Sequence, residues 1–230
     1  MKTIDQLNDI AGKKVLLRAD FDVAVNADGT VREPFRIQRQ RATIDFLLSR
    51  GARVLIAAHI SAIPSFAAIA EQISTIVGQP LSVLKTLEDI PAFLAGNETI
   101  ALLENIRTWP EEEKNDATFA RRLASLGDIY INDAFAVSHR AHASVHAITK
   151  YLPSYAGATL EQECSALSRI AHNPKRPLTV IVGGAKISTK MDLIRFFMKK
   201  GGADNVIIGG ALANTVLFAR GIRVGKSLVE

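Results

Sequence analysis

Short apolar runs alternate along the chain with longer segments whose apolar positions recur every three or four residues. The short runs are typical of β-strands, and the longer segments are typical of helices that bury one face. Strands are predicted at 13–21, 52–60, 80–84, 99–107, 128–133, 178–184 and 205–210. Helices are predicted at 37–51, 65–78, 86–96 and 116–127, over most of 147–174, at 189–200 and at 211–220.

This alternation indicates the fold class. Strands separated by helices of this length form βαβ units, whose parallel strands are covered by helices on both faces. We therefore expect an α/β fold with a three-layer, doubly wound, Rossmann-like parallel sheet. The polar segment NPKRP (173–177) interrupts the pattern, which restarts after it. We predict a first domain at 1–173 that ends in a long helix, and a second, incomplete α/β domain at 174–230.

Polar side chains follow four of the predicted strands. Ligands of open parallel sheets bind at the carboxyl ends of the strands, so we expect these side chains to line one basic cleft. In it Arg36, Arg107 and Arg140 would bind a small, doubly anionic ligand, because a guanidinium grips phosphate or carboxylate with a fork of donors. The four strand ends are RADFD (18–22), HIS (59–61), ENIR (104–107) and ND (132–133), the last of which runs on to HRAH (139–142).

Other interpretations of these residues remain open. Each arginine taken alone could be an ordinary solvated surface residue. His139 and His142 could suggest a metal pair, but no cysteine or carboxylate spacing supports a metal site. The lone Cys164 cannot form an internal disulfide and is expected to be a small buried hydrophobe.

In the second half, two strands run into paired glycines. LTVIVGGAKISTK and NVIIGGALANT both read as strand, two glycines and helix start. Glycines allow close backbone approach, and a helix N-terminus favours an anion, so we interpret the turns as a nucleotide-phosphate cradle. A plain strand–helix turn with exposed lysines would give the same pattern, which is not the Gly-x-x-x-x-Gly-Lys-Ser/Thr loop. The residues concerned are Gly183, Gly184, Lys186, Lys190, Gly209 and Gly210.

Composition narrows the choice of partners. The net charge of +5 and the pI of about 9.4 could suit nucleic acid, an anionic membrane surface or small acidic ligands. No run of Lys or Arg exceeds two residues, which disfavours a nucleic-acid-binding module. Apolar runs are much shorter than a membrane span, and the N-terminus lacks the pattern of a secretory signal. We therefore expect a cytoplasmic protein.

The same segments resemble a known family. RADFDVAV, AHIS, LLENIRTWPEEEKND, FARRLASLGDIYINDAFAVSHRAHASV, LPSYAG, IVGGAKISTKM, IIGGALANT and GKSLVE follow the order and spacing of phosphoglycerate kinase. The likeness covers nearly the whole chain and is strongest over 102–145 and 178–230. It implies a monomer of two doubly wound domains with a hinge helix. It also implies phosphoryl transfer between 1,3-bisphosphoglycerate and ADP, which gives 3-phosphoglycerate and ATP, with Mg²⁺ carried by the nucleotide.

By position, the resemblance assigns roles to residues of this chain. The first domain would bind phosphoglycerate and the second would bind ATP or ADP through the glycines and lysines named above. Arg36 and Lys190 are implied as catalytic, and no residue is implied as a metal ligand. The implied substrate-binding residues are Asp20, Asp22, Arg36, His59, Arg107 and Arg140.

Three features depart from the family's pattern. Asp22 replaces the usual Asn, and an ionised carboxylate only accepts hydrogen bonds and repels an anion. Ala62 replaces a substrate-binding arginine; since a charge-assisted hydrogen bond is worth about 1.5–3 kcal/mol, substrate binding would weaken roughly ten- to a hundred-fold unless Arg39 or Arg41 compensates. The chain stops at Glu230, so we expect a piece of a longer protein. The alternative is a non-catalytic relative that keeps only anion or 3-phosphoglycerate binding.

Overall fold

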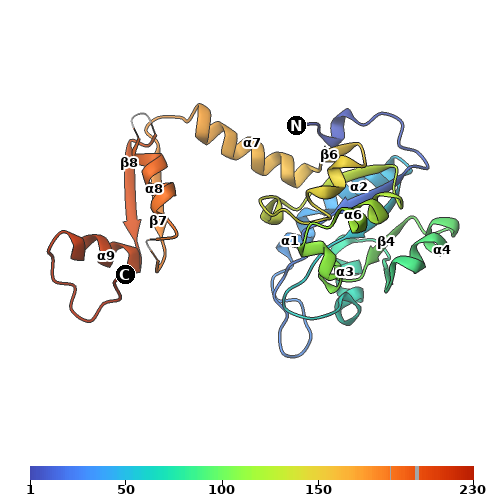
Figure 1. Ribbon diagram of the computed structural model, residues 1–230, viewed down its shortest axis with the longest axis horizontal. Helices are drawn as coiled ribbons and strands as arrows, with labels where there is room; N and C mark the ends of the chain where they lie inside the picture. The colour runs from blue at the N-terminus through green and yellow to red at the C-terminus, as the bar shows by residue number, and fades with distance from the viewer. Residues whose placement is uncertain (187, 200–201) are drawn as a thin grey trace. The chain divides into compact units, whose positions relative to one another are not determined.

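The computed structural model describes residues 1–186, 188–199 and 202–230 (Figure 1). The chain divides into two compact units, Met1–Cys164 and Ser165–Glu230. The division falls inside the helix α7 (Ala158–His172). The predicted boundary at 173/174 follows that helix, and the domain assignment stays a prediction.

The first unit, which the structure describes throughout, contains a six-stranded parallel sheet with the spatial order β3-β4-β2-β1-β5-β6. Its strands are β1 (Lys14–Arg18), β2 (Arg53–Ala57), β3 (Ser82–Leu84), β4 (Ile100–Leu103), β5 (Ile129–Asn132) and β6 (Ser154–Ala156). Its α-helices are α1 (Phe35–Arg39), α2 (Arg41–Ser49), α3 (Ala70–Val77), α4 (Ile90–Ala95), α5 (Pro110–Glu113), α6 (Ala117–Ala124) and the start of α7. Short 3-10 helices lie at Ile4–Gln6, Phe66–Ile69, Leu87–Asp89, Ile106–Thr108, Phe135–Val137 and Ala147–Lys150.

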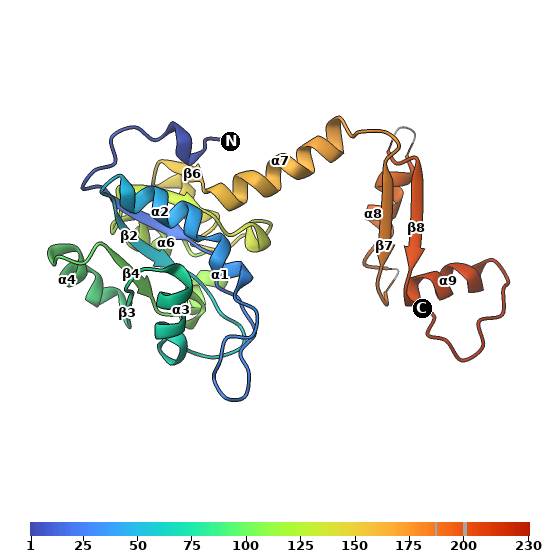
Figure 2. The same cartoon turned by 180° about the vertical axis from the view of Figure 1, so that it is seen from behind.

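Helices cover both faces of this sheet. Successive strand residues point to opposite faces, so Val15 and Leu17 pack in one core with α2 and α3, while Leu16 packs in a second core with α4 and α6. Figure 1 views the sheet from the side of α6, and Figure 2 from the side of α2. The predicted three-layer, doubly wound α/β fold is confirmed.

The prediction from sequence differs most from the structure over 147–174. Most of 147–174 was expected to be helical, but a 3-10 turn and the strand β6 precede α7. β6 has three residues, too few to show a pattern, and it forms because its backbone pairs with the neighbouring β5. Two predicted helix ends are confirmed. Asp116 caps α6 by accepting from the backbone N–H of Phe119 at 2.8 Å, and Gly78 ends α3 with a φ of 76°.

The second unit is built on a two-stranded parallel sheet, β7 (Thr179–Gly183) and β8 (Asn205–Gly209), with the helices α8 (Met191–Met198) and α9 (Ala211–Ala219). Val182, Ile194 and Leu212 form its core. The predicted end of α8 at Lys200 lies outside the described residues. Over the described part of the chain, no helix is both long and apolar enough to cross a membrane.

Candidate functional site

Four neighbouring strands of the first unit end in polar residues. β4, β2, β1 and β5 are consecutive in the sheet and all parallel, so their carboxyl ends meet at one edge. The connections also change direction between β1 and β5, because β2 lies on one side of β1 and β6 lies beyond β5 on the other. A ligand of an open sheet binds at such a switch point, which places the expected cleft at this edge.

Contacts link the polar residues across this edge. The Arg36 guanidinium lies 3.6 Å from the Asp20 carboxylate and donates to the Asp22 carbonyl oxygen at 3.3 Å. The backbone N–H of Ser61 donates to the Asp22 carboxylate at 2.8 Å, and Arg107 Nη1 donates to the Ser61 hydroxyl at 3.4 Å. Residues that follow β1 and β4 are thus joined through Ser61, which follows β2.

The segment after β5 joins the same group of charges. Burial lowers the pKa of His142, the Glu112 carboxylate opposes this shift, and the nearby charges of Arg107 and Arg140 lower it further. Arg140 is exposed. Both arginines therefore lie near one buried imidazole. We call Arg36, Asp22, Ser61 and Arg107, which are joined by contacts, together with Arg140, which is linked to them by its charge effect on His142, the arginine rim.

Arg107 carries a donor that lacks an acceptor. Its side chain is 19% exposed, Nη1 binds Ser61, and Nε lies 3.2 Å from the Glu113 carboxylate. Nη2 is buried and has no hydrogen-bond partner among the described residues. A buried donor without a partner costs about 1–3 kcal/mol, and more when it is charged. An anionic ligand would remove this cost.

His59 is held by two neighbours in a single tautomer. Arg18 Nη2 lies 3.2 Å from Nδ1, and Nε2 lies 3.4 Å from the Asp22 carboxylate. A guanidinium can only donate, so Nδ1 accepts and the proton on Nε2 faces Asp22. This hydrogen bond and the one from Ser61 hold the pKa of Asp22 well below its usual range, although partial burial opposes them. Asp22 is therefore ionised at neutral pH and contributes a negative charge to the rim.

A buried polar network beneath the rim was missed by sequence reasoning. Arg18 and Glu112 are both 0% exposed and are bridged by Ser144. Arg18 Nε donates to the Ser144 hydroxyl at 2.9 Å, and this hydroxyl donates to Glu112 at 2.6 Å. Tyr130 donates to the Ser144 carbonyl at 2.7 Å. The sequence shows these residue types but not their burial, so Arg18 could not be told from a ligand-binding arginine.

Asp133, at the end of β5, caps the start of α7 from outside the helix. Its carboxylate accepts from the Thr43 hydroxyl at 2.7 Å and from the backbone N–H of Leu160 at 2.9 Å. Thr43 in turn accepts from the N–H of Ala158 at 2.9 Å. Gly157 makes room for this contact, because a Cβ there would lie 2.4 Å from the Asp133 Cγ. The first-turn donors of α7 are thus satisfied by side chains from α2 and β5.

Asp133→Asn is expected to flatten the pH dependence of stability. Burial raises the pKa of Asp133 to about 6 from 3.8, against its hydrogen bonds with Leu160 and Thr43. The folded state then holds the proton more tightly than the unfolded state, so this group's contribution is present below its unfolded pKa and is lost as pH rises to about 6. The shift corresponds to about 3 kcal/mol.

Urea unfolding at several pH values between about 3.5 and 7 measures this effect. The difference in unfolding free energy between the native chain and Asp133→Asn should change across the range, with the native chain losing more stability as pH rises. Asp45→Asn, at an exposed position on α2, is the control. Parallel curves for the native chain and Asp133→Asn would show that Asp133 titrates normally.

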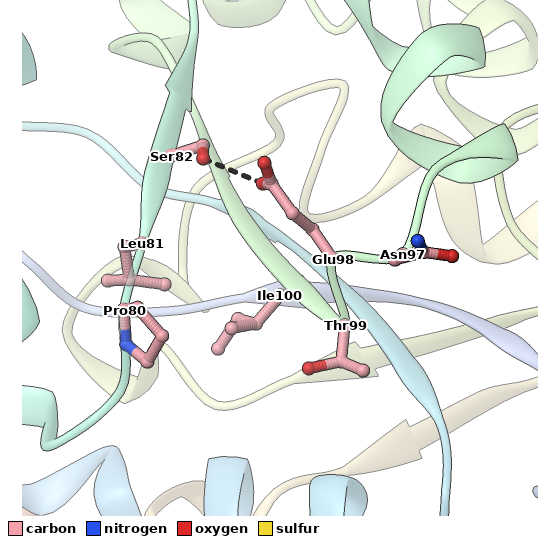
Figure 3. Close-up of a pocket in the computed structure, with 7 residues that line it drawn as sticks. All are labelled: Pro80, Leu81, Ser82, Asn97, Glu98, Thr99 and Ile100. Carbon is pink, nitrogen blue, oxygen red and sulfur yellow. Dashed lines mark hydrogen bonds between the residues drawn. The ribbon is translucent and has the colours of Figure 1, made fainter.

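A cavity of about 390 Å³ lies at the opposite end of the sheet. It is bounded by the amino-terminal ends of β3 and β4, and the Ser82 hydroxyl donates to the Glu98 carboxylate across it at 2.6 Å (Figure 3). This hydrogen bond gives a partner to the Glu98 carboxylate, which is the charged group in the lining of the cavity. The residues that line it are Pro80, Leu81, Ser82, Asn97, Glu98, Thr99 and Ile100. It contains none of the predicted site residues.

In the second unit, the two glycine turns lie side by side. Gly183 and Gly209 are in register at the ends of β7 and β8. The Gly184 carbonyl accepts from the N–H of Leu212 at 2.9 Å, and Gly210, with a φ of 64°, lies against the Gly184 backbone. No atom lies within 4 Å of where a Cβ of Gly209 would stand. The turns therefore leave open space above bare backbone, as a phosphate site requires.

The lysines of this region differ in their placement. Lys190 is the N-cap residue of α8, and its Cε lies 3.7 Å from where a Cβ of Gly184 would be. Lys186 is exposed. The Glu230 carboxylate accepts from the Ser188 hydroxyl at 2.6 Å, close to these lysines in sequence. The Lys190 side chain thus lies beside the glycine turns. Lys186 follows the first turn in sequence and is exposed.

Among the residues that the structure describes, no group of three or more His, Cys, Asp or Glu side chains could hold a metal ion. His139 is exposed, and His142 Nδ1 lies 3.8 Å from the Glu112 carboxylate. The HRAH segment therefore contains one exposed histidine, His139, and one buried histidine, His142.

Comparisons with known proteins agree along the whole chain. The family model described as phosphoglycerate kinase matches residues 4–230. The chain is 43% identical over 237 residues to the phosphoglycerate kinase of Novosphingobium aromaticivorans, covering 100% of this chain and 59% of the relative. It is 45% identical over 240 residues to that of Agrobacterium fabrum, with the same coverage.

Solved structures give the same result. The phosphoglycerate kinase of Coxiella burnetii matches with a TM-score of 0.84 and 34% identity over 99% of this chain and 59% of that one. The enzyme of Pyrococcus horikoshii matches with a TM-score of 0.88 and 25% identity over 98% and 59%. The chain thus spans about 59% of the length of the relatives that it matches.

Proposed function

Because the chain belongs to the phosphoglycerate kinase family, we propose that it acts in reversible phosphoryl transfer between 1,3-bisphosphoglycerate and ADP, giving 3-phosphoglycerate and ATP. The observation that carries the proposal is the buried Nη2 donor of Arg107, which has no partner among the described residues and belongs to the same rim as Arg36 and Arg140. A small molecule with a phosphate and a carboxylate supplies the acceptors that this rim lacks.

The proposed roles follow from exposure and contact. Arg36 has a side chain that is 51% exposed and is held by two long contacts, so its guanidinium can turn toward a transferred phosphoryl group. Arg107 and Arg140 bind the phosphoglycerate, and His59, whose two ring nitrogens contact Arg18 and Asp22, holds Asp22 in place beside them. Phosphoryl transfer depends on positioning and charge stabilisation rather than on a covalent step, and arginines suit both tasks.

The nucleotide site is proposed at the glycine turns of the second unit. Gly183, Gly184, Gly209 and Gly210 leave room for phosphates, and Lys190 supplies a positive charge beside them. Lys186 is proposed to bind the same phosphates from the border of the site. Mg²⁺ would arrive with the nucleotide, and no residue of this chain is proposed as its ligand. The proposal extends to a cytoplasmic monomer with small-molecule substrates and no nucleic-acid or membrane partner.

Calorimetric titration of the chain with 3-phosphoglycerate tests the substrate site, and Ala62→Arg sharpens the test. Ala62 is exposed next to Ser61, which contacts both Asp22 and Arg107. An arginine there adds a charge-assisted hydrogen bond worth about 1.5–3 kcal/mol. We expect the native chain to bind and Ala62→Arg to bind roughly ten- to a hundred-fold more tightly.

Thr75→Arg is the matched control, because it adds the same charge at an exposed position on α3. It should leave the affinity nearly unchanged. If neither the native chain nor Ala62→Arg released binding heat with 3-phosphoglycerate, the proposed substrate would be wrong. Equal tightening by both variants would indicate a general charge effect and not a site beside Ser61.

A further inference from the structure

We propose that Arg39 is a positioning residue that holds Arg36 in place by fastening α1 to the first two turns of α7. This inference rests on the proposed function, which assigns the transferred phosphoryl group to Arg36. Arg39 itself does not contact the substrate. It acts through the short helix that it shares with Arg36.

Arg39 is joined to α7 at three points. Its guanidinium forms an ion pair with Glu163, and Nη2 donates to the Gln162 side chain at 3.1 Å. Its carbonyl oxygen accepts from the Thr159 hydroxyl at 3.1 Å. The Arg39 and Glu163 side chains are 28% and 32% exposed, so the pair is partly shielded from water and is stronger than a fully exposed pair.

Besides α7, the helix that carries both arginines is supported by Ile37, which packs in the core with α3, and by α2, which follows it directly. α1 has five residues, of which Ile37 is buried, and a helix this short is not stable by itself. The Arg39 guanidinium also lies 5.8 Å from the centre of the Phe35 ring, which is 65% exposed. Phe35 and Arg36 are adjacent in sequence, so the side chain of Arg39 ties the start of α1 to α7.

The arrangement surrounds one cavity. A space of about 240 Å³ is lined by Arg36, Arg39 and Glu163 together with Asp20 and Asp133. Asp133 caps α7, and Asp20 contacts Arg36 of the rim. Residues that hold α7, residues that join α1 to α7 and residues of the rim therefore line the same cavity. A shift of α1 relative to α7 therefore moves Arg36 relative to Asp20 and Asp22.

These contacts also show whether Arg39 or Arg41 replaces the substrate contact that is lost at Ala62. The sequence left open that Arg39 or Arg41 supplies the lost substrate contact. Arg39 is occupied by Gln162 and Glu163 on α7. The Arg41 guanidinium lies beside Gly78, at the end of α3, 3.1 Å from where a Cβ of that glycine would stand. Neither side chain replaces the missing arginine.

A double-mutant cycle tests the positioning role. The affinity for 3-phosphoglycerate is measured by calorimetry for the native chain, Arg39→Ala, Arg36→Ala and the double variant. Loss of positioning should weaken binding about five- to ten-fold in the native background. In the Arg36→Ala background, Arg39→Ala should change the affinity by less than about two-fold, because the group that it positions is gone. Arg41→Ala should match the native chain.

Hydrogen exchange of the free chain gives a readout that needs no ligand. Arg39→Ala should raise exchange of the backbone amides in α1 by at least about ten-fold, while Arg41→Ala leaves it unchanged. Unchanged exchange in Arg39→Ala would overturn the proposal, as would equal losses of affinity in both backgrounds. Failure of every variant to bind 3-phosphoglycerate, with increased exchange in Arg39→Ala, would refute the proposed substrate and retain the fastening of α1.

Discussion

Under the proposed function, Arg36→Ala is expected to lower the rate of phosphoryl transfer by at least about a thousand-fold, the scale on which a charge-stabilising arginine acts in phosphoryl transfer. Its effect on stability should be small, within about 0.5 kcal/mol. The side chain is 51% exposed, and its contacts with Asp20 and Asp22 are long. Few native contacts are therefore lost when it is removed.

Steady-state assays with 3-phosphoglycerate and ATP, together with thermal unfolding, measure both quantities. Arg36→Lys should fall between the native enzyme and the alanine variant, because lysine keeps the charge but not the fork of donors. Arg32→Ala, at an exposed position in the same loop region, should retain full activity. Retained turnover accompanied by a large loss of stability in Arg36→Ala would assign Arg36 to the fold and not to the reaction.

The edge of the sheet that carries the site could be predicted from the sequence. Alternation of strands and helices gives a parallel sheet, and in a parallel sheet the residues that follow the strands meet at one edge. Asp22, Ser61 and Arg107 follow three different strands, and Ser61 contacts both of the others. Their convergence is a consequence of topology, which the hydrophobic pattern determines.

The burial and the contacts of each side chain at that edge could not be predicted. Arg18 ends β1 and Arg36 follows the same strand, yet Arg18 is 0% exposed and the Arg36 side chain is 51% exposed. Arg18 is the last residue of β1 and points into the core beneath the rim, where Ser144 comes from a segment far away in sequence. Burial of this kind depends on tertiary contacts that no local pattern records.

The cap of α7 was missed for a similar reason. Sequence reasoning expects a capping residue directly before a helix, and Gly157 stands there instead. The cap comes from Asp133 and Thr43, which are brought to Gly157 by the sheet and by α2. A glycine before a helix, with a close neighbour in space, is the signal that could have indicated a cap from outside the helix.

The buried network beneath the rim should carry a large share of the stability of the first unit, and Glu112→Ala tests this. The Glu112 carboxylate accepts from both the backbone N–H and the hydroxyl of Ser144, at 2.8 and 2.6 Å. Its charge opposes the effect of burial, which lowers the pKa of Arg18. Removing it leaves Ser144 without its acceptor and the buried Arg18 charge uncompensated, a change that costs about 3–5 kcal/mol.

Urea unfolding followed by tryptophan fluorescence isolates this effect, because the single tryptophan, Trp109, packs against Phe119 in the first unit. Glu111→Ala is the matched control: it removes a neighbouring carboxylate at an exposed position of α5, so its cost should stay below about 1 kcal/mol. A loss in Glu112→Ala no larger than in Glu111→Ala would mean that water or backbone groups stabilise Arg18. The positive charge beneath the rim would then not depend on Glu112, and rim affinity for 3-phosphoglycerate should survive the substitution.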